Sequence, residues 1–299
     1  ERDFFQIDPN EIESITILKD ASSTAVFGVQ GANGVIIVTT KRGSEGTPKI
    51  NVSLSSGIQV PLRLLDFADS YQYCIAKNEM LGYNFYTDEV MEKFRTQENP
   101  LLYPSNNWIK YMVKPFSWQT QNNINISGGS SIIKYFVSVG YFSQDGMFKQ
   151  FSSDFHDNFK YHRYNFRSNF DIYPTKTTRL GISMGGMSGT RVEPRHDDGI
   201  NSFFGSIYES LPMSGIGIVD GRPVAGNSRY HTGESGGGGS PFSAWYGNGT
   251  TYVNPNDMNF DIALTQELDM FFKGLSASAK YSYNSKYTHI KNRTYSVPT

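Results

Sequence analysis

The chain has 299 residues, which suits one large domain or two of ordinary size. Its 27 Lys and Arg against 28 Asp and Glu give a formal net charge of -1. Without a basic excess or a basic stripe, nucleic acid is excluded as a partner. The mean hydropathy of -0.44 resembles that of a soluble protein. However, 14% of the residues are aromatic and 29 are Gly, which fits an all-β chain, including a membrane barrel in which every second residue faces lipid.

A single cysteine, Cys74, excludes an internal disulfide framework and any zinc cluster built from cysteines. We expect it to be a small buried hydrophobic residue. No run approaches about 18 consecutive apolar residues, so no transmembrane helix is expected. Glu1–Phe5 lack the basic start and apolar centre of a signal peptide. We therefore expect a mature chain or one that begins inside a longer protein.

Residues 12–40 carry the signals of two strands joined by a short helix and a turn. Ile12–Leu18 alternates between apolar and polar residues as a strand does, and the small residues of Ala21–Phe27 suit two helical turns. Val35–Thr40 is a β-branched run without a polar face. That composition predicts a strand buried on both sides.

Three glycines, Gly28, Gly31 and Gly34, separate the two predicted strands. A strand, a glycine turn and a second strand could form a nucleotide site, but the spacing is GxxGxxG rather than GxGxxG. The glycines also precede a strand, whereas the dinucleotide-binding motif opens a helix. We therefore interpret them as residues that allow a tight turn between helix and strand.

A longer motif runs through this segment. It consists of Ile12-Glu13-Ser14-Ile15, Leu18-Lys19-Asp20-Ala21-Ser22, Gly31-Ala32-Asn33-Gly34-Val35-Ile36-Ile37 and Thr39-Thr40-Lys41-Arg42-Gly43. This motif resembles the plug-domain signature of SusC/RagA-type TonB-dependent outer-membrane transporters. It departs from the family at Phe27-Gly28-Val29-Gln30, where Tyr-Gly-Ser-Arg is usual, and so lacks one common plug arginine. The resemblance implies that residues 1–46 are the C-terminal part of an α+β plug domain. The structural positions of its motif are Lys19, Asp20, Gly28, Gly31, Asn33, Gly34, Arg42 and Gly43.

The rest of the chain shows the alternation of long antiparallel strands. Between Asn259 and Met270 the even positions are almost all apolar and the odd ones almost all polar, and the pattern resumes from Leu275 to Asn284. Similar runs lie at 50–58, 122–127, 134–143, 159–172 and 180–188. Several reach the roughly 9 to 11 residues that a tilted strand needs to cross a bilayer. Strands of soluble proteins are typically shorter.

The connections between these strands alternate in length. Long ones span 60–121, 144–158 and 189–258, and short turns lie at 128–131, 174–177 and 271–273. In a meander every second connection lies at the same end of the sheet, so all long connections share one end. Long extracellular loops and short periplasmic turns are typical of an outer-membrane barrel. Residues 47–299 are therefore predicted to be the N-terminal portion of an up-and-down transmembrane β-barrel.

This barrel is predicted to be incomplete. We count about seven strands, and an open sheet cannot stand alone in lipid because its edge amides would lack partners. The family's barrel has many more strands and follows a complete plug. We therefore expect the chain to cover only part of a transporter.

The first long connection carries helix signals. Asp69 or Ser70 suits the N-cap of a helix that runs to Leu81, and Thr87-Asp88-Glu89-Val90 resembles the start of another helix. We expect these helices to be a solvated decoration of the loop rather than a site.

The connection at 189–258 contains the residues that we considered as metal ligands or catalytic groups. His196-Asp197-Asp198 offers oxygen ligands for calcium, but three adjacent side chains reach one ion only on a special backbone, so no metal or cofactor is expected. No Ser/His/Asp or Cys/His set stands out, and we expect no catalysis. Gly236–Ser240 matches a common engineered linker and equally a natural flexible loop tip.

Four residues of the same connection are candidate ligand contacts, namely Tyr230, His231, Trp245 and Tyr246. Aromatic faces stack on sugar rings or on peptide side chains. The alternative is that these residues belong to the aromatic girdle of a barrel or pack within the loop.

The resemblance implies an energised importer of oligosaccharides or oligopeptides in the bacterial outer membrane. A SusD-like surface lipoprotein would cap the pore, and TonB, acting through a TonB box outside this chain, would pull on the plug. Siderophore or cobalamin uptake by the same barrel type is one alternative, which the SusC-type signature opposes. A soluble secreted polysaccharide-binding β protein is another, which both the signature and the loop asymmetry oppose.

Overall fold

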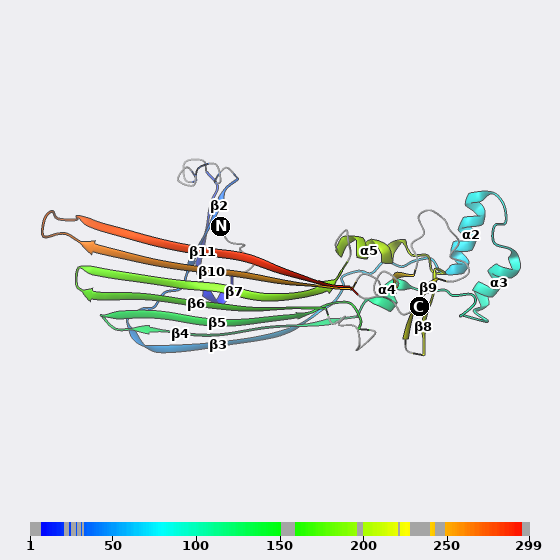
Figure 1. Ribbon diagram of the computed structural model, residues 1–299, viewed down its shortest axis with the longest axis horizontal. Helices are drawn as coiled ribbons and strands as arrows, with labels where there is room; N and C mark the ends of the chain where they lie inside the picture. Colours follow the sequence, from blue (N-terminus) through cyan, green and yellow to red (C-terminus); the bar gives the residue numbers. More distant parts are fainter. Residues whose placement is uncertain are drawn as a thin grey trace.

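The computed structural model describes residues 7–20, 24, 28, 31, 33–150, 159–195, 200–220, 222–227, 240–242 and 249–294. A seven-stranded sheet forms its body, a two-stranded hairpin lies across one face of that sheet, and helices gather at one end (Figure 1). Within these ranges, no helix combines the length and the apolar character that crossing a membrane requires.

The large sheet is an antiparallel meander in the order β11-β10-β7-β6-β5-β4-β3. Its strands are β3 (Gly46–Gln59), β4 (Ser117–Gly129), β5 (Ile133–Asp145), β6 (Lys160–Thr175), β7 (Thr178–Pro194), β10 (Thr250–Glu267) and β11 (Ser276–Arg293). In the described part of the chain β3 and β11 are edge strands that do not pair with each other, so the sheet is open.

The two faces of the sheet have opposite character. On β6 every odd position from Arg163 to Asp171 is polar or charged and buried, whereas the even positions are mostly aromatic. Paired residues of neighbouring strands share a face; Ser138 and Gly185, for example, both pair with Arg167 on the polar face. The opposite face exposes large apolar side chains, among them Ile124, Val139, Tyr164, Met184, Leu264 and Tyr281. This arrangement is the inverse of a soluble sheet, whose apolar face is covered.

Several strands extend further toward the long loops than their alternation predicts. Residues 117–121, 144–145, 189–194 and 250–258 belong to strands and not to loops. The run from Gln119 to Asn123 is polar throughout, so it shows no alternation of apolar and polar residues from which a strand could be predicted. The ladder of backbone hydrogen bonds continues there nevertheless, because it does not depend on side chains.

The hairpin consists of β1 (Ile12–Leu18) and β2 (Val35–Thr40), which pair antiparallel. Gly34 has a φ of +91°, and a Cβ added there would lie 3.1 Å from the carbonyl oxygen of Leu18, so the turn requires glycine. The prediction that β2 is buried on both sides is wrong, since Ile36 is 55% exposed. Among the described residues β2 pairs with β1 alone, and a doubly buried strand needs a layer on each face.

The long connections all lie at one end of the sheet and the short turns at the other (Figure 1). The long connections contain α2 (Ser70–Leu81), α3 (Asp88–Thr96), α4 (Trp108–Met112), α5 (Ile200–Glu209) and a second hairpin of β8 (Gly215–Val219) and β9 (Arg222–Asn227). The first two helices begin where the sequence predicts. Asp69 caps α2 in a capping box with Gln72, and Thr87 caps α3.

The buried apolar clusters lie among these loops rather than on the sheet. One consists of Trp108, Ile109, Met112, Phe148, Phe159, Ile207 and Phe242. The other joins α2 to α3 through Cys74, Tyr86, Phe94 and Met213. Cys74 is fully buried as predicted, and burial raises the pKa of its thiol to about 12. The helices thus have a hydrophobic core of their own. The expectation that they are a solvated decoration of the loop did not include this core.

Phe94→Ala should destabilise the α2–α3 unit by about 3 to 5 kcal/mol, because the ring is 2% exposed within the cluster. Limited proteolysis of the full-length protein should then cut between residues 70 and 96 while the sheet stays protected. Phe85→Ala is the matched control, since Phe85 is 41% exposed. Equal cleavage of both variants would show that Phe94 contributes no packing.

Candidate functional site

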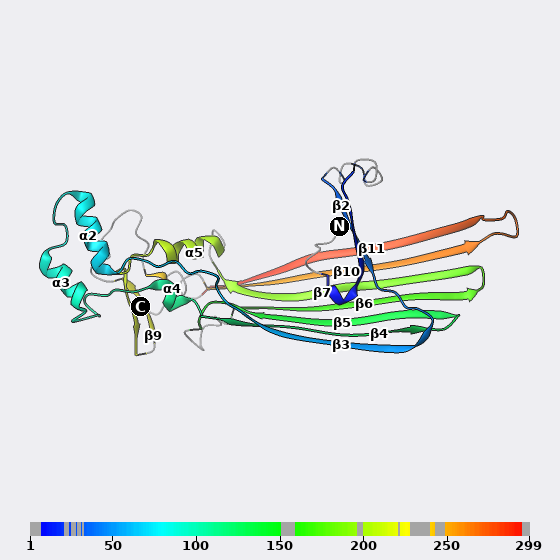
Figure 2. The same cartoon turned by 180° about the vertical axis from the view of Figure 1, so that it is seen from behind.

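The hairpin touches the sheet through two short segments, residues 8–11 before β1 and residues 40–43 at the end of β2 and just beyond it (Figure 2). A 3-10 turn, η2 (Pro9–Glu11), shapes the first segment. The backbone nitrogen of Lys41 donates to the carbonyl oxygen of Glu11 at 2.9 Å, which ties the two segments together. These segments meet the polar face of the sheet and form the candidate functional site.

An ion pair between Glu11 and Arg167 is deeply buried at this contact. Arg167 Nε donates to Glu11 Oε2 at 2.6 Å, and the side chains are 6% and 2% exposed. Gly185 on β7 leaves room for the guanidinium, because a Cβ there would lie 3.0 Å from Arg167 Nη1. Removing one partner of such a pair leaves a buried charge uncompensated.

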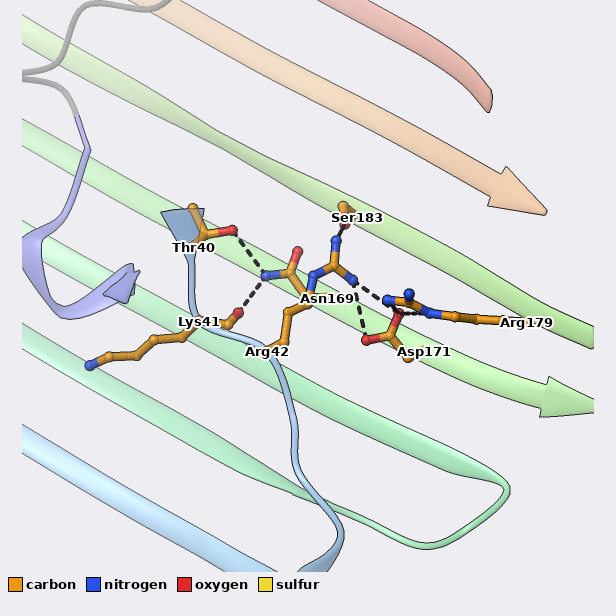
Figure 3. Close-up of polar contacts among 7 residues, drawn as sticks. All are labelled: Thr40, Lys41, Arg42, Asn169, Asp171, Arg179 and Ser183. Carbon is orange, nitrogen blue, oxygen red and sulfur yellow. Dashed lines mark hydrogen bonds and ion pairs between the residues drawn. The ribbon is translucent and has the colours of Figure 1, made fainter. Parts of the chain in front are cut away.

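A second, more exposed ion cluster lies nearer the short-turn end of the sheet (Figure 3). Arg42 donates to the two oxygens of Asp171 at 3.0 and 3.2 Å. Arg179 donates to Asp171 Oδ1 from Nε at 3.1 Å and from Nη2 at 2.8 Å. The Asp171 side chain is 7% exposed, and those of Arg42 and Arg179 are 43% and 47% exposed. Asp171 therefore binds one arginine from the hairpin segment and one from the sheet at the same time.

Neutral side chains of the sheet add hydrogen bonds to the same segments. Asn169 Nδ2 donates to the Lys41 carbonyl oxygen at 2.6 Å and lies 3.4 Å from Thr40 Oγ1 (Figure 3). Asn123 Nδ2 donates to Asp8 Oδ2 at 3.0 Å. Each such bond contributes about 1 kcal/mol net. Together they fix the position of the hairpin along β4 and β6.

Glycines allow the closest approach of these segments to the sheet. A Cβ on Gly43 would fall 2.7 Å from the carbonyl carbon of Tyr135 in β5. A Cβ on Gly140 of the same strand would collide with the Asp8 carboxylate. The site therefore excludes larger side chains at both positions.

The chain is similar to TonB-dependent receptors. No family model matches it. TonB-dependent receptor P26 of Formosa agariphila is 30% identical over 220 residues, which cover 72% of this chain and 20% of that protein. TonB-dependent receptor SusC of Bacteroides thetaiotaomicron is 29% identical over 144 residues, 48% of this chain and 13% of SusC. The RagAB peptide importer in its open-open state matches with a TM-score of 0.71 at 22% identity, over 95% of this chain and 33% of the matched chain.

The chain belongs to the SusC/RagA-type TonB-dependent transporters. It spans about a fifth of the length of the first curated relatives, 20% and 19%. The sheet is accordingly part of a barrel wall in the bacterial outer membrane, with its apolar face toward lipid and its polar face toward the lumen. The hairpin belongs to the plug.

The two ion clusters of the plug differ in burial. Asp171 has two arginine partners, Arg42 and Arg179, and both are about half exposed, so loss of the Arg42 charge leaves Asp171 paired. Glu11 and Arg167 are both buried, so loss of the Glu11 charge leaves Arg167 without this carboxylate while the plug is docked. Loss of the Arg42 contact should therefore cost less than loss of the Glu11 contact.

Glu11→Gln should loosen the plug more than Arg42→Gln. The first change leaves Arg167 buried without a counter-charge and should cost about 3 to 5 kcal/mol of docking free energy, against about 1 kcal/mol or less for the exposed Arg42. Hydrogen–deuterium exchange of residues 12–18 and 35–40 in the full-length protein measures the difference. The double variant Glu11→Gln with Arg167→Gln should recover much of the loss. Faster exchange in Arg42→Gln than in Glu11→Gln would contradict this account.

Of the plug positions singled out in the sequence, Arg42 and Gly43 lie at the contact with the wall. Gly28 and Gly34 have φ of +59° and +91° and lie between the two hairpin strands. The remaining positions, Lys19, Asp20, Gly31 and Asn33, lie in the same connection, between β1 and β2.

Most residues of the site were not predicted from the sequence. They are Asp8, Glu11, Asn123, Arg167, Asn169, Asp171 and Arg179. A signal was present on β6, where every odd position from Arg163 to Asp171 is polar or charged. That pattern indicates a polar face but not the segment that covers it.

The candidate ligand contacts Tyr230, His231, Trp245 and Tyr246 lie outside the described residues, as do His196–Asp198 and residues 236–239. In the part of the chain that the structure describes, no three or more His, Cys, Asp or Glu side chains group as a metal site would require.

Leu264→Arg should cost up to about 4 kcal/mol of membrane stability, because it places a charge in lipid. Leu264 pairs with Leu180 and Ala279 on the apolar face. Thr265→Arg is the matched control, since the next residue along the strand faces the lumen. The yield of assembled full-length protein in the outer membrane measures the effect. Equal yields would show that the assignment of the faces is wrong.

Proposed function

We propose that the full-length protein actively imports oligomeric nutrients, oligosaccharides or oligopeptides, across the bacterial outer membrane. The observation that carries this proposal is the way in which the plug hairpin is held. Ion pairs and hydrogen bonds join it to the lumen wall, and large apolar side chains of the hairpin such as Ile15, Ile17 and Ile36 stay exposed. Polar contacts exchange readily for contacts with water, so a pull can detach such a segment and let it return.

The proposal includes two partners. TonB supplies the pull through a TonB box outside this chain, because a docked plug does not open by itself. A SusD-like surface lipoprotein caps the loop end, where α2 and α5 expose large apolar side chains such as Met80 and Tyr208. The RagAB structures, which share this fold, are described as a peptide importer. The proposed role requires binding and plug movement and no covalent chemistry.

Uptake by a strain that produces the full-length protein tests the proposal. Accumulation of labelled oligosaccharides or oligopeptides should stop when the proton gradient is collapsed or TonB is deleted, and should fall when the lipoprotein is deleted. Uptake that persists without the gradient would indicate a passive pore. Release of the protein without detergent would support a soluble polysaccharide-binding protein instead.

A further inference from the structure

We propose that a hollow at the loop end of the lumen binds an apolar side chain of an oligopeptide ligand. The hollow has a volume of about 490 Å³ and lies between the end of β3, α4 and α5. Its volume is within the range of known ligand pockets, about 300 to 1,000 Å³. The inference rests on the proposed function and selects one of its two ligand classes.

The walls of this hollow are apolar. They are formed mainly by Val60, Leu64, Ile109, Val113, Phe204 and Tyr208. Within the described residues no charged side chain lines it, and Gln59 is its one amide. Ile109 is 2% exposed and fixes the inner wall, whereas Leu64 and Phe204 are 40% and 37% exposed and form an accessible mouth.

A row of amide side chains borders the hollow on the lumen face. Gln59 Nε2 donates to Gln119 Oε1 at 2.7 Å, and Gln144 Nε2 donates to Gln59 Oε1 at 2.9 Å. These glutamines come from β3, β4 and β5, near the loop ends of the three strands. An extended peptide offers backbone donors and acceptors that suit such amides, while its alternate side chains point to opposite sides.

The chemistry of the hollow favours a peptide over a sugar. A sugar ring carries hydroxyl groups on most of its carbons, and a buried hydroxyl without a hydrogen-bond partner is costly. Most of the wall residues, such as Val60, Leu64 and Ile109, offer no such partner, and among the described lining side chains only the Gln59 amide and the Tyr208 hydroxyl could do so. An apolar side chain leaves no polar group unpaired, and its burial is favourable. None of the described lining side chains is charged, which likewise disfavours acidic sugars and other ionic ligands.

Thiol labelling of the full-length protein, in complex with its lipoprotein, tests access and ligand class together. Cys74 is the only cysteine of this chain. Its thiol is buried and has a raised pKa, so it should not react with a maleimide. Leu64→Cys should react, and a Leu-rich oligopeptide should slow that reaction about tenfold or more, whereas oligosaccharides should not. Leu62→Cys is the matched control, because Leu62 is fully exposed on the same segment and should react without protection.

Affinity gives a second measurement. Leu64→Asn should weaken binding of the Leu-rich oligopeptide about tenfold, the scale expected for one buried apolar side chain. It should not change binding of a Ser-rich oligopeptide of equal length. Leu62→Asn should change neither affinity.

Each contrary result has a distinct meaning. A Leu64→Cys thiol that does not react would show that another part of the protein fills the hollow, which overturns the proposal. Protection by oligosaccharides alone would overturn the ligand class and leave the proposed import function standing. Protection by the lipoprotein without any peptide would make the hollow a partner contact and overturn the site. Loss of energised uptake with peptide binding intact would count against the import function and not against this site.

Discussion

The opposite polarity of the two faces of each strand is the constraint on which the rest of the structure depends. A strand that turns apolar residues to lipid must turn its other residues inward, and on β6 these are arginines, asparagines and an aspartate. Whatever fills the lumen must therefore meet a polar surface. The plug does so with Asp8, Glu11 and Arg42 rather than with its isoleucines. The plug contact is thus electrostatic because the lipid outside the barrel takes the apolar face of each strand, which leaves the polar face for the plug.

The same constraint explains where the apolar cores are found. Since the inner face of the sheet is polar and the outer face meets lipid, neither can hold a conventional hydrophobic core. The described clusters of buried apolar residues, around Trp108 and around Cys74, lie in the loops beyond the end of the sheet. The loop end is consequently a folded structure of its own, able to keep the walls of a binding hollow in place.

Local signals in the sequence predicted the local structure well, and long-range contacts much less well. Alternation located the strands, and the capping residues Asp69 and Thr87 located the starts of two helices. Strand ends such as residues 117–121 were not predicted, because side chains on both faces of the strand are mostly polar there and show no alternation. Of the plug contact, only Arg42 and Gly43 could be singled out, through a motif. Their partners Asp171 and Tyr135 lie far along the chain. The periodicity of a sequence does not indicate which distant residue a side chain contacts.

The distance in sequence between partners at the plug contact has a consequence for assembly. Glu11 and Arg167 are 156 positions apart, and Arg42 and Asp171 are 129 apart. Contacts of such long range form after local pairing, so the wall has to exist before the plug can fit it. A slip of β6 by one residue would turn Tyr164 and Phe166 inward in place of the charged row. Glu11 and Arg42 would then lose their partners on β6, so the plug contact described here is possible only when the wall is paired in this register.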